Sequence, residues 1–418
     1  MKQNPNYTWT VFFLIRAVEE LWADADIMIK TLLEVNMHRD LSIILCLNAD
    51  AAKLGKEYPR GEASRVSGFT TLFYKIARKE QGDQINTNYL ELIHEWPSFD
   101  IRNPEHIIQY LQKDVLKRAS AEKYMLLTWD HGTAFGMYRG TDEPEKLPNK
   151  FNQRVETSIT RMLDMDDLAK AITLAFDGQK IDIITMMNCD MQFFDTGYSL
   201  APVTKFLIAT ESWLQPDSYD YKAIFNKISE DIDISPRQLS KFIVASFAKK
   251  NKHLEGIALF AIQLKYYKVL GILIDKLAVG LSTKLEDNHE AITRARAPWE
   301  ELNANFGTID FYSLLKALRQ ELPESIMNRS LYKKLKRMKK KATVSKYIGE
   351  DYINETTLTK NSPTAFSIFF PGTVSRLHEE LVLKYMTDKS QHASLYSRVS
   401  RWNNFVFDYV SRYGPKKS

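Results

Sequence analysis

Short apolar runs that alternate with helical patterns constrain the fold of this chain more than any other feature. Six such runs in the first half are too short for helices and are rich in β-branched or aromatic residues: Trp9–Ile15, Leu41–Leu47, Phe69–Ile76, Tyr124–Trp129, Ile181–Met187 and Lys205–Thr210. Helical spacing separates several of them, as in residues 19–36 and 165–176. This rhythm predicts an α/β fold with a mainly parallel sheet and helices on both faces.

The second half of the chain is more helical. Helices are predicted at Tyr267–Leu281, Ile309–Glu321, Ser330–Lys341, Ser375–Met386 and Ala393–Tyr413. Two apolar runs, Gly256–Leu264 and Phe366–Phe370, predict late strands that rejoin the core sheet. We therefore expect a core of residues 1–255, followed by a helical C-terminal region, 256–418, that contributes late strands to the same sheet.

Composition excludes several classes of protein. The chain has two cysteines, Cys46 and Cys189, too few for a disulfide scaffold or a zinc site built from cysteines alone. No apolar run approaches the roughly 18–20 residues that a membrane span requires. The N-terminal segment lacks the long apolar core and the cleavage site of a signal peptide. On this basis we expect a cytoplasmic protein without a membrane span.

Positive charge is concentrated in one stretch. The net charge is +5, yet Arg329–Lys341 holds eight basic residues and no acid, and without it 49 basic residues face 52 acidic ones. Leu331, Leu335 and Met338 recur at helical spacing, which predicts a basic helix that packs on the core by one apolar face. The alternatives are a regulatory or nucleic-acid partner bound at this helix, or contact with a membrane surface.

Two predicted strands end in residues that could carry chemistry. The strand Tyr124–Trp129 leads to His131, and Ile181–Met187 leads to Cys189. An imidazole can remove the proton of a thiol or lower its pKa, which makes the sulfur a nucleophile. The residue pattern leaves a second interpretation open, in which Cys189 is a small buried apolar side chain, as we expect for Cys46.

The motifs around His131 and Cys189 favour the first interpretation, in which Cys189 is a nucleophile. The segment Tyr124-Met-Leu-Leu-Thr-Trp-Asp-His131-Gly132 resembles the strand and His-Gly signature of the clostripain family of cysteine peptidases. The segment Ile183-Ile-Thr-Met-Met-Asn-Cys189-Asp-Met191 resembles the strand of that family that carries the nucleophile. Similar pieces in matching order span nearly the whole chain: Trp9-Thr-Val-Phe, Asn103-Pro-Glu, Phe206-Leu-Ile-Ala-Thr-Glu211-Ser, Pro216–Tyr221, Ile309-Asp-Phe-Tyr and Phe366–Pro371.

The resemblance implies a caspase-like fold and a Cys–His dyad. Cys189 would be the nucleophile, His131 the general base, and the backbone N–H groups of Gly132 and Cys189 the oxyanion hole. The implied reaction is attack on a peptide carbonyl, an acyl-enzyme and its hydrolysis, with no metal or cofactor. Calcium dependence follows from the family alone, because no oxygen-rich loop in this sequence identifies a calcium site.

The sequence departs from the family where the substrate binds. Family members often carry an acid two residues before the cysteine, and Met187 stands there in this chain. Asp217 matches the second acid of the pocket, so we expect a preference for arginine or lysine before the scissile bond that one carboxylate supports. The other interpretation of Asp217 is a turn residue after Pro216. Thr133, where a further glycine is common, is expected to narrow the space beside His131.

The polar loop 141–154 occupies the place where relatives are cleaved during maturation. It offers Lys146, Lys150 and Arg154 to an enzyme that cuts after basic residues, so self-cleavage is predicted there, with an ordinary solvated loop as the alternative. The sequence as a whole predicts a cysteine endopeptidase that acts on proteins or peptides. The alternatives are a caspase-like interaction module that no longer cuts, and a protease that responds to nucleic acid or another ligand.

Overall fold

The structure is a computed structural model of the 418-residue chain. The residues that it describes are 5–17, 19–61, 68–78, 88–138, 162–211, 213–254, 256–297, 307–349, 364–377, 380–386 and 394–415. Within these ranges no helix is both long and apolar enough to cross a lipid bilayer.

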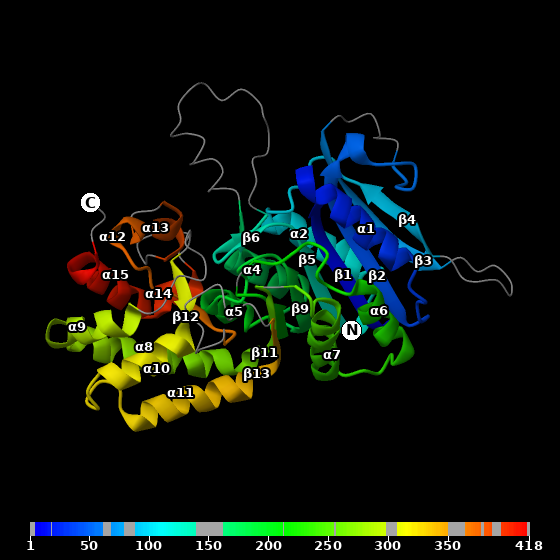
Figure 1. The fold of residues 1–418 in the computed structure, drawn as a ribbon. Coiled ribbons are helices and arrows are strands. Elements are labelled where there is room, and N and C mark those ends of the chain that lie inside the picture. The colour runs from blue at the N-terminus through cyan, green and yellow to red at the C-terminus, as the bar shows by residue number, and fades with distance from the viewer. Residues whose placement is uncertain are drawn as a thin grey trace, which may run out of the picture.

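A nine-stranded sheet runs through the centre of the larger lobe (Figure 1). Its strands are β1 (Tyr7–Ala17), β2 (Leu41–Asp50), β3 (Phe69–Arg78), β4 (Asn88–Glu95), β5 (Ala121–Trp129), β9 (Ile181–Met187), β10 (Thr204–Ala209), β11 (Ala258–Gln263) and β13 (Thr343–Ile348). Their spatial order is β13-β11-β10-β9-β5-β1-β2-β3-β4. The five strands from β10 to β2 are parallel, and two antiparallel strands flank them on each side.

The predicted α/β fold with a mainly parallel core sheet is therefore confirmed. All six apolar runs of the first half form strands of this sheet. The sequence pattern does not predict β4 and β13, which lie at the two edges. Both are only partly buried, so they lack the continuous apolar run by which the central strands are recognised.

Helices cover both faces of the sheet, as the strands require. Along β1, Phe12 and Leu14 belong to one core cluster, while Val11 and Phe13 belong to a second on the opposite face. The second cluster includes side chains of α1 (Trp22–Leu33), α6 (Tyr221–Glu230) and α7 (Pro236–Lys250). The first includes side chains of α2 (Pro104–Tyr110), α4 (Met165–Ala175) and α5 (Phe194–Leu200).

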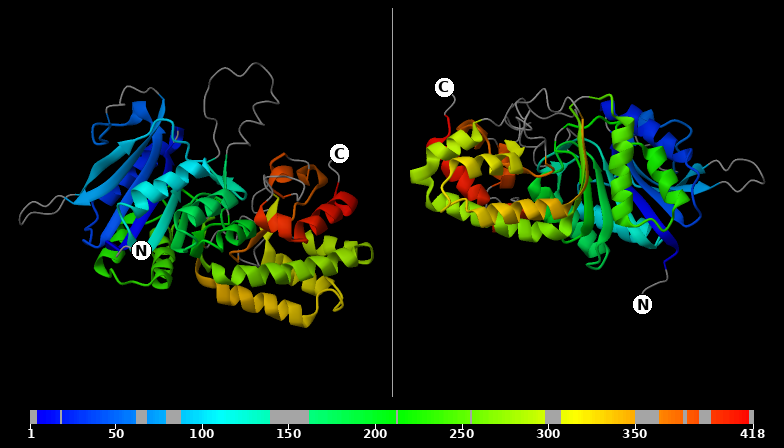
Figure 2. Two further views of the ribbon diagram at one scale, coloured as in Figure 1. Left: turned by 180° about the vertical axis from the view of Figure 1, so that it is seen from behind. Right: turned by 60° about the horizontal axis from the view of Figure 1, so that its bottom comes forward.

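The C-terminal part forms a helical group beside the sheet (Figures 1 and 2). Its helices are α8 (Tyr267–Thr283), α9 (Leu285–Arg296), α10 (Phe311–Glu321), α11 (Arg329–Ala342), α12 (Val374–Leu377), α13 (Glu380–Met386), α14 (Leu395–Val399) and α15 (Trp402–Tyr413). Their apolar side chains continue the first core cluster. Two strands of this region, β11 and β13, lie in the central sheet.

The expected strand over Phe366–Phe370 forms as β14 (Ser367–Phe369), but it does not join the core sheet. It pairs instead with β12 (Thr308–Asp310) in a separate two-stranded sheet, so the expectation that it would rejoin the core was wrong. The indole N–H of Trp402 donates to the carbonyl of Phe369 at 2.8 Å. The hydroxyl of Ser367 donates to the carbonyl of Gln192 at 3.1 Å. Tertiary contacts that are invisible in the local sequence thus hold this strand among the C-terminal helices.

Two helical glycines give a matched test of the packing. A Cβ atom at Gly197, on α5, would overlap a ring carbon of the fully buried Tyr267. At Gly280, on α8, the nearest atom would be 3.6 Å away, on Ile326. We expect Gly197→Ala to lower the free energy of unfolding by about 1–3 kcal/mol through overpacking. Gly280→Ala should leave it unchanged or raise it by up to about 1 kcal/mol. Thermal unfolding followed by circular dichroism measures both, and equal destabilisation would contradict the packing.

Candidate active site

The carboxyl ends of β5 and β9 lie side by side because the two strands are parallel neighbours. The last residue of β5, Trp129, pairs in register with the last residue of β9, Met187. His131 and Cys189 each follow two residues later. The chain segments that carry the predicted imidazole and thiol therefore leave the sheet at the same edge, where parallel α/β sheets commonly hold their reactive groups.

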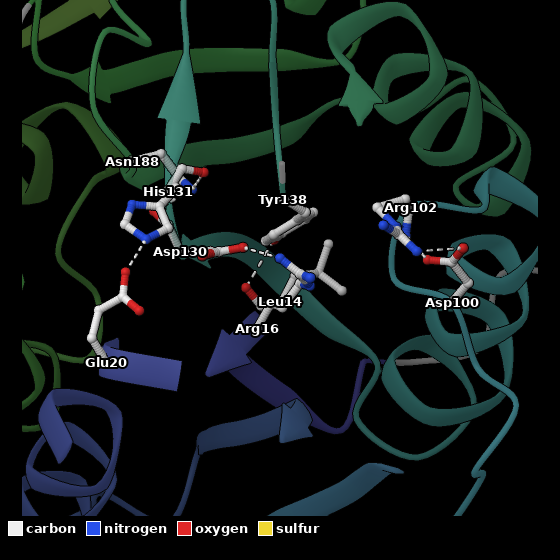
Figure 3. A network of polar contacts seen from close by, with 9 residues as sticks. All are labelled: Leu14, Arg16, Glu20, Asp100, Arg102, Asp130, His131, Tyr138 and Asn188. Atoms are coloured by element: carbon white, nitrogen blue, oxygen red, sulfur yellow. Dashed lines mark hydrogen bonds and ion pairs between the residues drawn. The ribbon is translucent and has the colours of Figure 1, made fainter. Parts of the chain in front are cut away.

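The side chain of Asn188 joins the two strand ends. Its carboxamide oxygen accepts a hydrogen bond from the hydroxyl of Thr128 at 2.5 Å. Its nitrogen donates to the main-chain carbonyls of Asp130 at 2.9 Å and His131 at 3.2 Å, and Figure 3 shows it directly beside His131. Because Asn188 is buried, these bonds are shielded from water and hold the backbone around His131 in one conformation.

Gly132 lies against the backbone of Cys189. A Cβ atom there would approach the carbonyl oxygen of Cys189 to 2.5 Å and its nitrogen to 3.0 Å, so only glycine fits without a backbone shift. The residue after the cysteine, Asp190, has φ of +63°, a left-handed conformation that residues with a side chain rarely adopt. The chain thus turns sharply at Cys189 and packs tightly on the turn after His131.

The thiol of Cys189 is mostly buried and is held by the segment after β10. The backbone N–H of Leu214 donates to Sγ at 3.4 Å. Burial raises the pKa of this thiol to about 11, and the bond from Leu214 opposes that rise in part. The group is therefore protonated at neutral pH and needs a base to become a nucleophile. Cys46 is fully buried within β2, where burial raises the pKa of its thiol well above the usual range, as expected for a core residue.

The imidazole of His131 is half exposed and is held by a carboxylate. Its Nε2 lies 3.1 Å from Oε1 of Glu20, which lies in the short 3-10 helix Glu19–Leu21 between β1 and α1 (Figure 3). A backbone hydrogen bond and the bond with His131 lower the pKa of Glu20, so this carboxyl is ionised at neutral pH. When the neutral ring donates from Nε2 to Glu20, the lone pair is on Nδ1, which can accept a proton.

The hydrogen bonds of the thiol and of the imidazole run to different partners. His131 bonds to Glu20, whereas Cys189 bonds to Leu214, and the described residues include no hydrogen bond between His131 and Cys189. In the resting protein the imidazole therefore does not activate the thiol. The two neighbouring strand ends nevertheless supply a protonated thiol and a carboxylate-held imidazole, the groups that nucleophilic catalysis by cysteine uses.

A buried ion pair supports the backbone immediately before His131. Nη1 of Arg16, at the end of β1, lies 3.2 Å from Oδ2 of Asp130, and both side chains are almost fully buried. Burial raises the pKa of Asp130 to about 6, an effect that the positive charge of Arg16 opposes. The hydroxyl of Tyr138 donates to the carbonyl of Leu14 at 2.9 Å in the same layer (Figure 3). This ion pair thus connects the end of β1 to the residue that follows β5.

The residues predicted to bind substrate lie in different environments. Met187 is only 5% exposed and packs in the second core cluster, so it offers little surface to a ligand. The side chain of Asp217 is 70% exposed, and its carboxylate is paired with Nζ of Lys250 at 2.7 Å. Thr133 is buried, and its hydroxyl bonds to the backbone of its own turn at Gly136.

Other predicted features lie outside the described residues or find no counterpart among them. Lys146, Lys150 and Arg154 fall in residues 139–161, which the structure does not describe, so self-cleavage there stays a prediction. Within the described ranges, no three His, Cys, Asp or Glu side chains gather closely enough to hold a metal ion.

Sequence reasoning missed four residues that form the site. Asn188 directly precedes the cysteine, and Asp130 directly precedes the histidine, so their positions carried a signal that was not used. For Arg16 the signal was weaker: it is a charged residue immediately after the apolar run Trp9–Ile15. Glu20 gave none, because its contact with His131 spans 111 residues of sequence.

Comparison with known proteins identifies the family of the chain. The model of the clostripain family matches residues 73–409. A secreted cysteine protease from Bacteroides thetaiotaomicron, called iotapain, superposes with a TM-score of 0.60 at 14% identity, covering 97% of this chain and 100% of that one. An inactive zymogen protease from Parabacteroides distasonis gives 0.62 at 14% identity, covering 97% and 99%.

A secreted cysteine protease from Bacteroides thetaiotaomicron in complex with an irreversible peptide inhibitor superposes with a TM-score of 0.60 at 12% identity, covering 96% of this chain and 99% of that one. No curated protein sequence matches the chain significantly. At these identities the likeness of the solved structures shows the caspase-like fold. The family model, which spans most of the chain, shows more: this protein is a member of the clostripain family of cysteine peptidases.

Proposed function

We propose that this chain is an endopeptidase in which Cys189 attacks the peptide carbonyl and His131 moves the proton. The observation that carries the proposal is the junction of two strand ends, where Asn188 binds the backbone at His131 and Gly132 packs on Cys189. Rigid support of this kind holds a nucleophile and a base in a common geometry, which is the main requirement of covalent catalysis.

In the first step Nδ1 of His131 accepts the thiol proton while Sγ of Cys189 bonds to the carbonyl carbon. The π electrons of the carbonyl move to its oxygen, which becomes negatively charged. The thiol needs this proton acceptor because burial holds its pKa at about 11. Glu20 is a positioning residue in this proposal: its carboxylate orients the ring through Nε2 and stabilises the imidazolium that forms.

The negative oxygen is stabilised by the backbone N–H groups of Gly132 and Cys189. Their segments converge closely enough that a Cβ at Gly132 would lie 3.0 Å from the nitrogen of Cys189. Two converging backbone donors form an oxyanion hole that needs no reorganisation during the reaction.

The second half of the reaction restores the enzyme. As the tetrahedral intermediate collapses, the C–N bond breaks and the imidazolium of His131 gives its proton to the leaving amine, which leaves a thioester on Cys189. His131 then takes a proton from a water molecule that attacks the thioester carbonyl. Collapse of this second intermediate releases the carboxylic acid and returns the proton to the sulfur.

We assign substrate selection to the segment around Leu214, from Trp213 to Asp217. Trp213 is 54% exposed beside the residue that hydrogen-bonds Cys189, and its indole offers an apolar wall to a peptide. Asp217 can attract an arginine or lysine side chain, but its carboxylate is already shared with Lys250. We therefore propose a modest preference for basic residues before the scissile bond.

A second candidate function is a non-catalytic interaction module of the same fold. The observation that favours it is that the thiol and the imidazole bond to Leu214 and to Glu20 instead of to each other. Activity measurements separate the two candidates directly.

The first experiment tests catalysis. Wild-type protein is assayed on a panel of fluorogenic peptides that differ at the residue before the scissile bond. Cys189→Ala and His131→Ala should each lower kcat/KM by at least about a thousandfold, because each removes an essential part of the reaction. Cys46→Ala is the matched control: it should lower the thermal midpoint and leave peptide cleavage in place. A folded wild type that cleaves none of the peptides would favour the interaction module.

The second experiment tests the positioning role of Glu20. Glu20→Gln should lower kcat on the order of tenfold with little change in KM or thermal midpoint, because the amide cannot stabilise the imidazolium by charge. The control Glu34→Gln also removes a surface carboxylate from an ion pair, with Lys222 at 2.8 Å, but away from His131, and should leave kcat unchanged. Equal effects of the two substitutions would exclude the positioning role.

The third experiment tests Asp217. Asp217→Asn should lower kcat/KM about tenfold for arginine and lysine peptides and leave neutral peptides unaffected, whereas Lys250→Met should raise it for the basic peptides by freeing the carboxylate. Lys250 also donates to the carbonyl of Tyr219 at 3.1 Å, so turnover of neutral peptides reports any damage to the loop. Loss of turnover on neutral and basic peptides alike in Asp217→Asn would assign the residue to the loop structure.

A further inference from the structure

A cavity of about 830 Å³ lies between α10, α11 and β13. In Figure 1, α11 runs beside α10 and ends where β13 begins. Six of the described residues that line the cavity are basic: Lys316, Lys336, Arg337, Lys339, Lys340 and Lys346. None of the other described lining residues is acidic. Positive charge thus converges on one concave site from two helices and a strand.

The helix itself packs as its apolar spacing predicts. Leu335 is buried in the first core cluster, and Leu331 and Met338 pack against that cluster. The prediction of a basic helix seated on the core is therefore confirmed. Packing on this face leaves the opposite side of α11 to carry its charges, and only part of that side faces the cavity: Arg329, Lys333 and Lys334 are not among the lining residues.

Three of the basic side chains at the cavity form no ion pair with a carboxylate of the described residues. Among the described residues, no carboxylate forms an ion pair with Arg337, Lys340 or Lys346. Lys336 lies over the ring of Tyr332, 5.4 Å from its centroid, and Lys339 over that of Tyr312 at 4.7 Å. Rings of this kind hold the two ammonium groups at the cavity wall without neutralising them.

The pKa of Lys339 reflects the crowding of positive charges at the site. Burial lowers its pKa, and repulsion from Lys346 and Lys336 lowers it further, while the buried carboxyls Asp310 and Glu211 oppose the shift. Mutual repulsion of lysines is a cost that a bound anion would remove. The shape of the cavity and its positive charge therefore favour a ligand with several negative charges in a small volume.

We propose that this cavity binds a small ligand that carries at least two phosphate groups. A volume of this size is typical of sites for small molecules. Phosphate groups concentrate more charge per volume than carboxylates, and lysine and arginine are their usual protein partners. A polynucleotide or an acidic protein would instead use the whole exposed face of α11, including Arg329, Lys333 and Lys334, which do not line the cavity.

The cavity is connected to the thiol by short steps. Lys339 interacts electrostatically with Glu211, a fully buried residue whose pKa is raised well above its usual value by burial and by Asp310. Glu211 follows β10 and precedes by three residues Leu214, whose N–H bonds to Cys189. A bound phosphate competes with Glu211 for the positive charge of Lys339 and so changes the electrostatic environment of the Glu211 carboxyl. We therefore expect ligand binding to change the reactivity of Cys189, a consequence that rests on the proposed role of this thiol.

Calorimetry with sodium tripolyphosphate and the full chain tests the binding site. The triple variant Lys336→Gln/Arg337→Gln/Lys340→Gln should weaken binding at least about tenfold. The matched control, Arg329→Gln/Lys333→Gln/Lys334→Gln, removes the same charge from the same helix outside the cavity and should change affinity less than about threefold. Equal weakening by the two variants, or no heat of binding to the wild type, would overturn the proposal.

Two further arms identify the source of the phosphates. Vesicles of phosphatidylcholine that contain a phosphoinositide, compared with vesicles of phosphatidylcholine alone, show whether a lipid headgroup can supply them; binding of free tripolyphosphate alone assigns a soluble ligand. A short single-stranded RNA that binds tighter than tripolyphosphate and is lost in the control variant would overturn the small-ligand site in favour of a nucleic-acid surface.

The coupling to the thiol has its own measurement. The rate of alkylation of Cys189 by iodoacetamide, followed by mass spectrometry, should change at least about threefold on saturation with tripolyphosphate in the wild type, and should not change in the cavity variant. This readout does not require peptidase activity, so it stands even if no peptide is cleaved. An unchanged alkylation rate despite binding would exclude the coupling.

Discussion

The parallel pairing of β5 with β9 is the constraint on which the site depends. Because the carboxyl ends of neighbouring strands lie at the same edge only when the strands run the same way, this pairing brings residues 58 positions apart to one place. The carboxamide of Asn188 then replaces the ladder hydrogen bonds that end at the last strand residues. Without that side chain the carbonyl of Asp130 would lose its buried donor, and the carbonyl of His131 would keep the backbone N–H of Tyr138 at 3.3 Å.

Burial sets the electrostatics of this region. It raises the pKa of Cys189 and that of Asp130, because a buried negative charge is unfavourable. The two residues differ in the group that offsets this effect. Asp130 has the guanidinium of Arg16 beside it, so it serves as a fixed structural charge. At Cys189 the bond from the backbone N–H of Leu214, a neutral donor, offsets burial in part, so the thiol stays protonated until a base acts on it. A buried and protonated thiol is a resting state that is protected from adventitious oxidation and alkylation.

The C-terminal helical group does more than cover the sheet. It contributes β13 to one edge and places α11 beside that edge. Lys339 on α11 interacts electrostatically with the buried carboxyl of Asp310 in the same group and with that of Glu211 in the core. Charge on α11 is thus linked to the segment after β10. The net positive charge of the chain, which composition reports as a single number, is concentrated on α11, and half of the eight basic residues in that stretch line one concave site next to the sheet.

The amino-acid sequence by itself determined the central strands and the residues at their ends. The runs that form β1, β2, β5, β9 and β10 are apolar on both faces, and such segments can only be stable between two layers of helices. The local pattern was insufficient for β4, β13 and β14, because partly exposed or isolated strands take their partners from elsewhere in the chain. Tertiary structure alone decided that Glu20 holds His131 and that Lys250 pairs with Asp217. Those contacts join residues far apart in sequence. A local pattern of polar residues does not show which distant charged side chain lies nearby after folding.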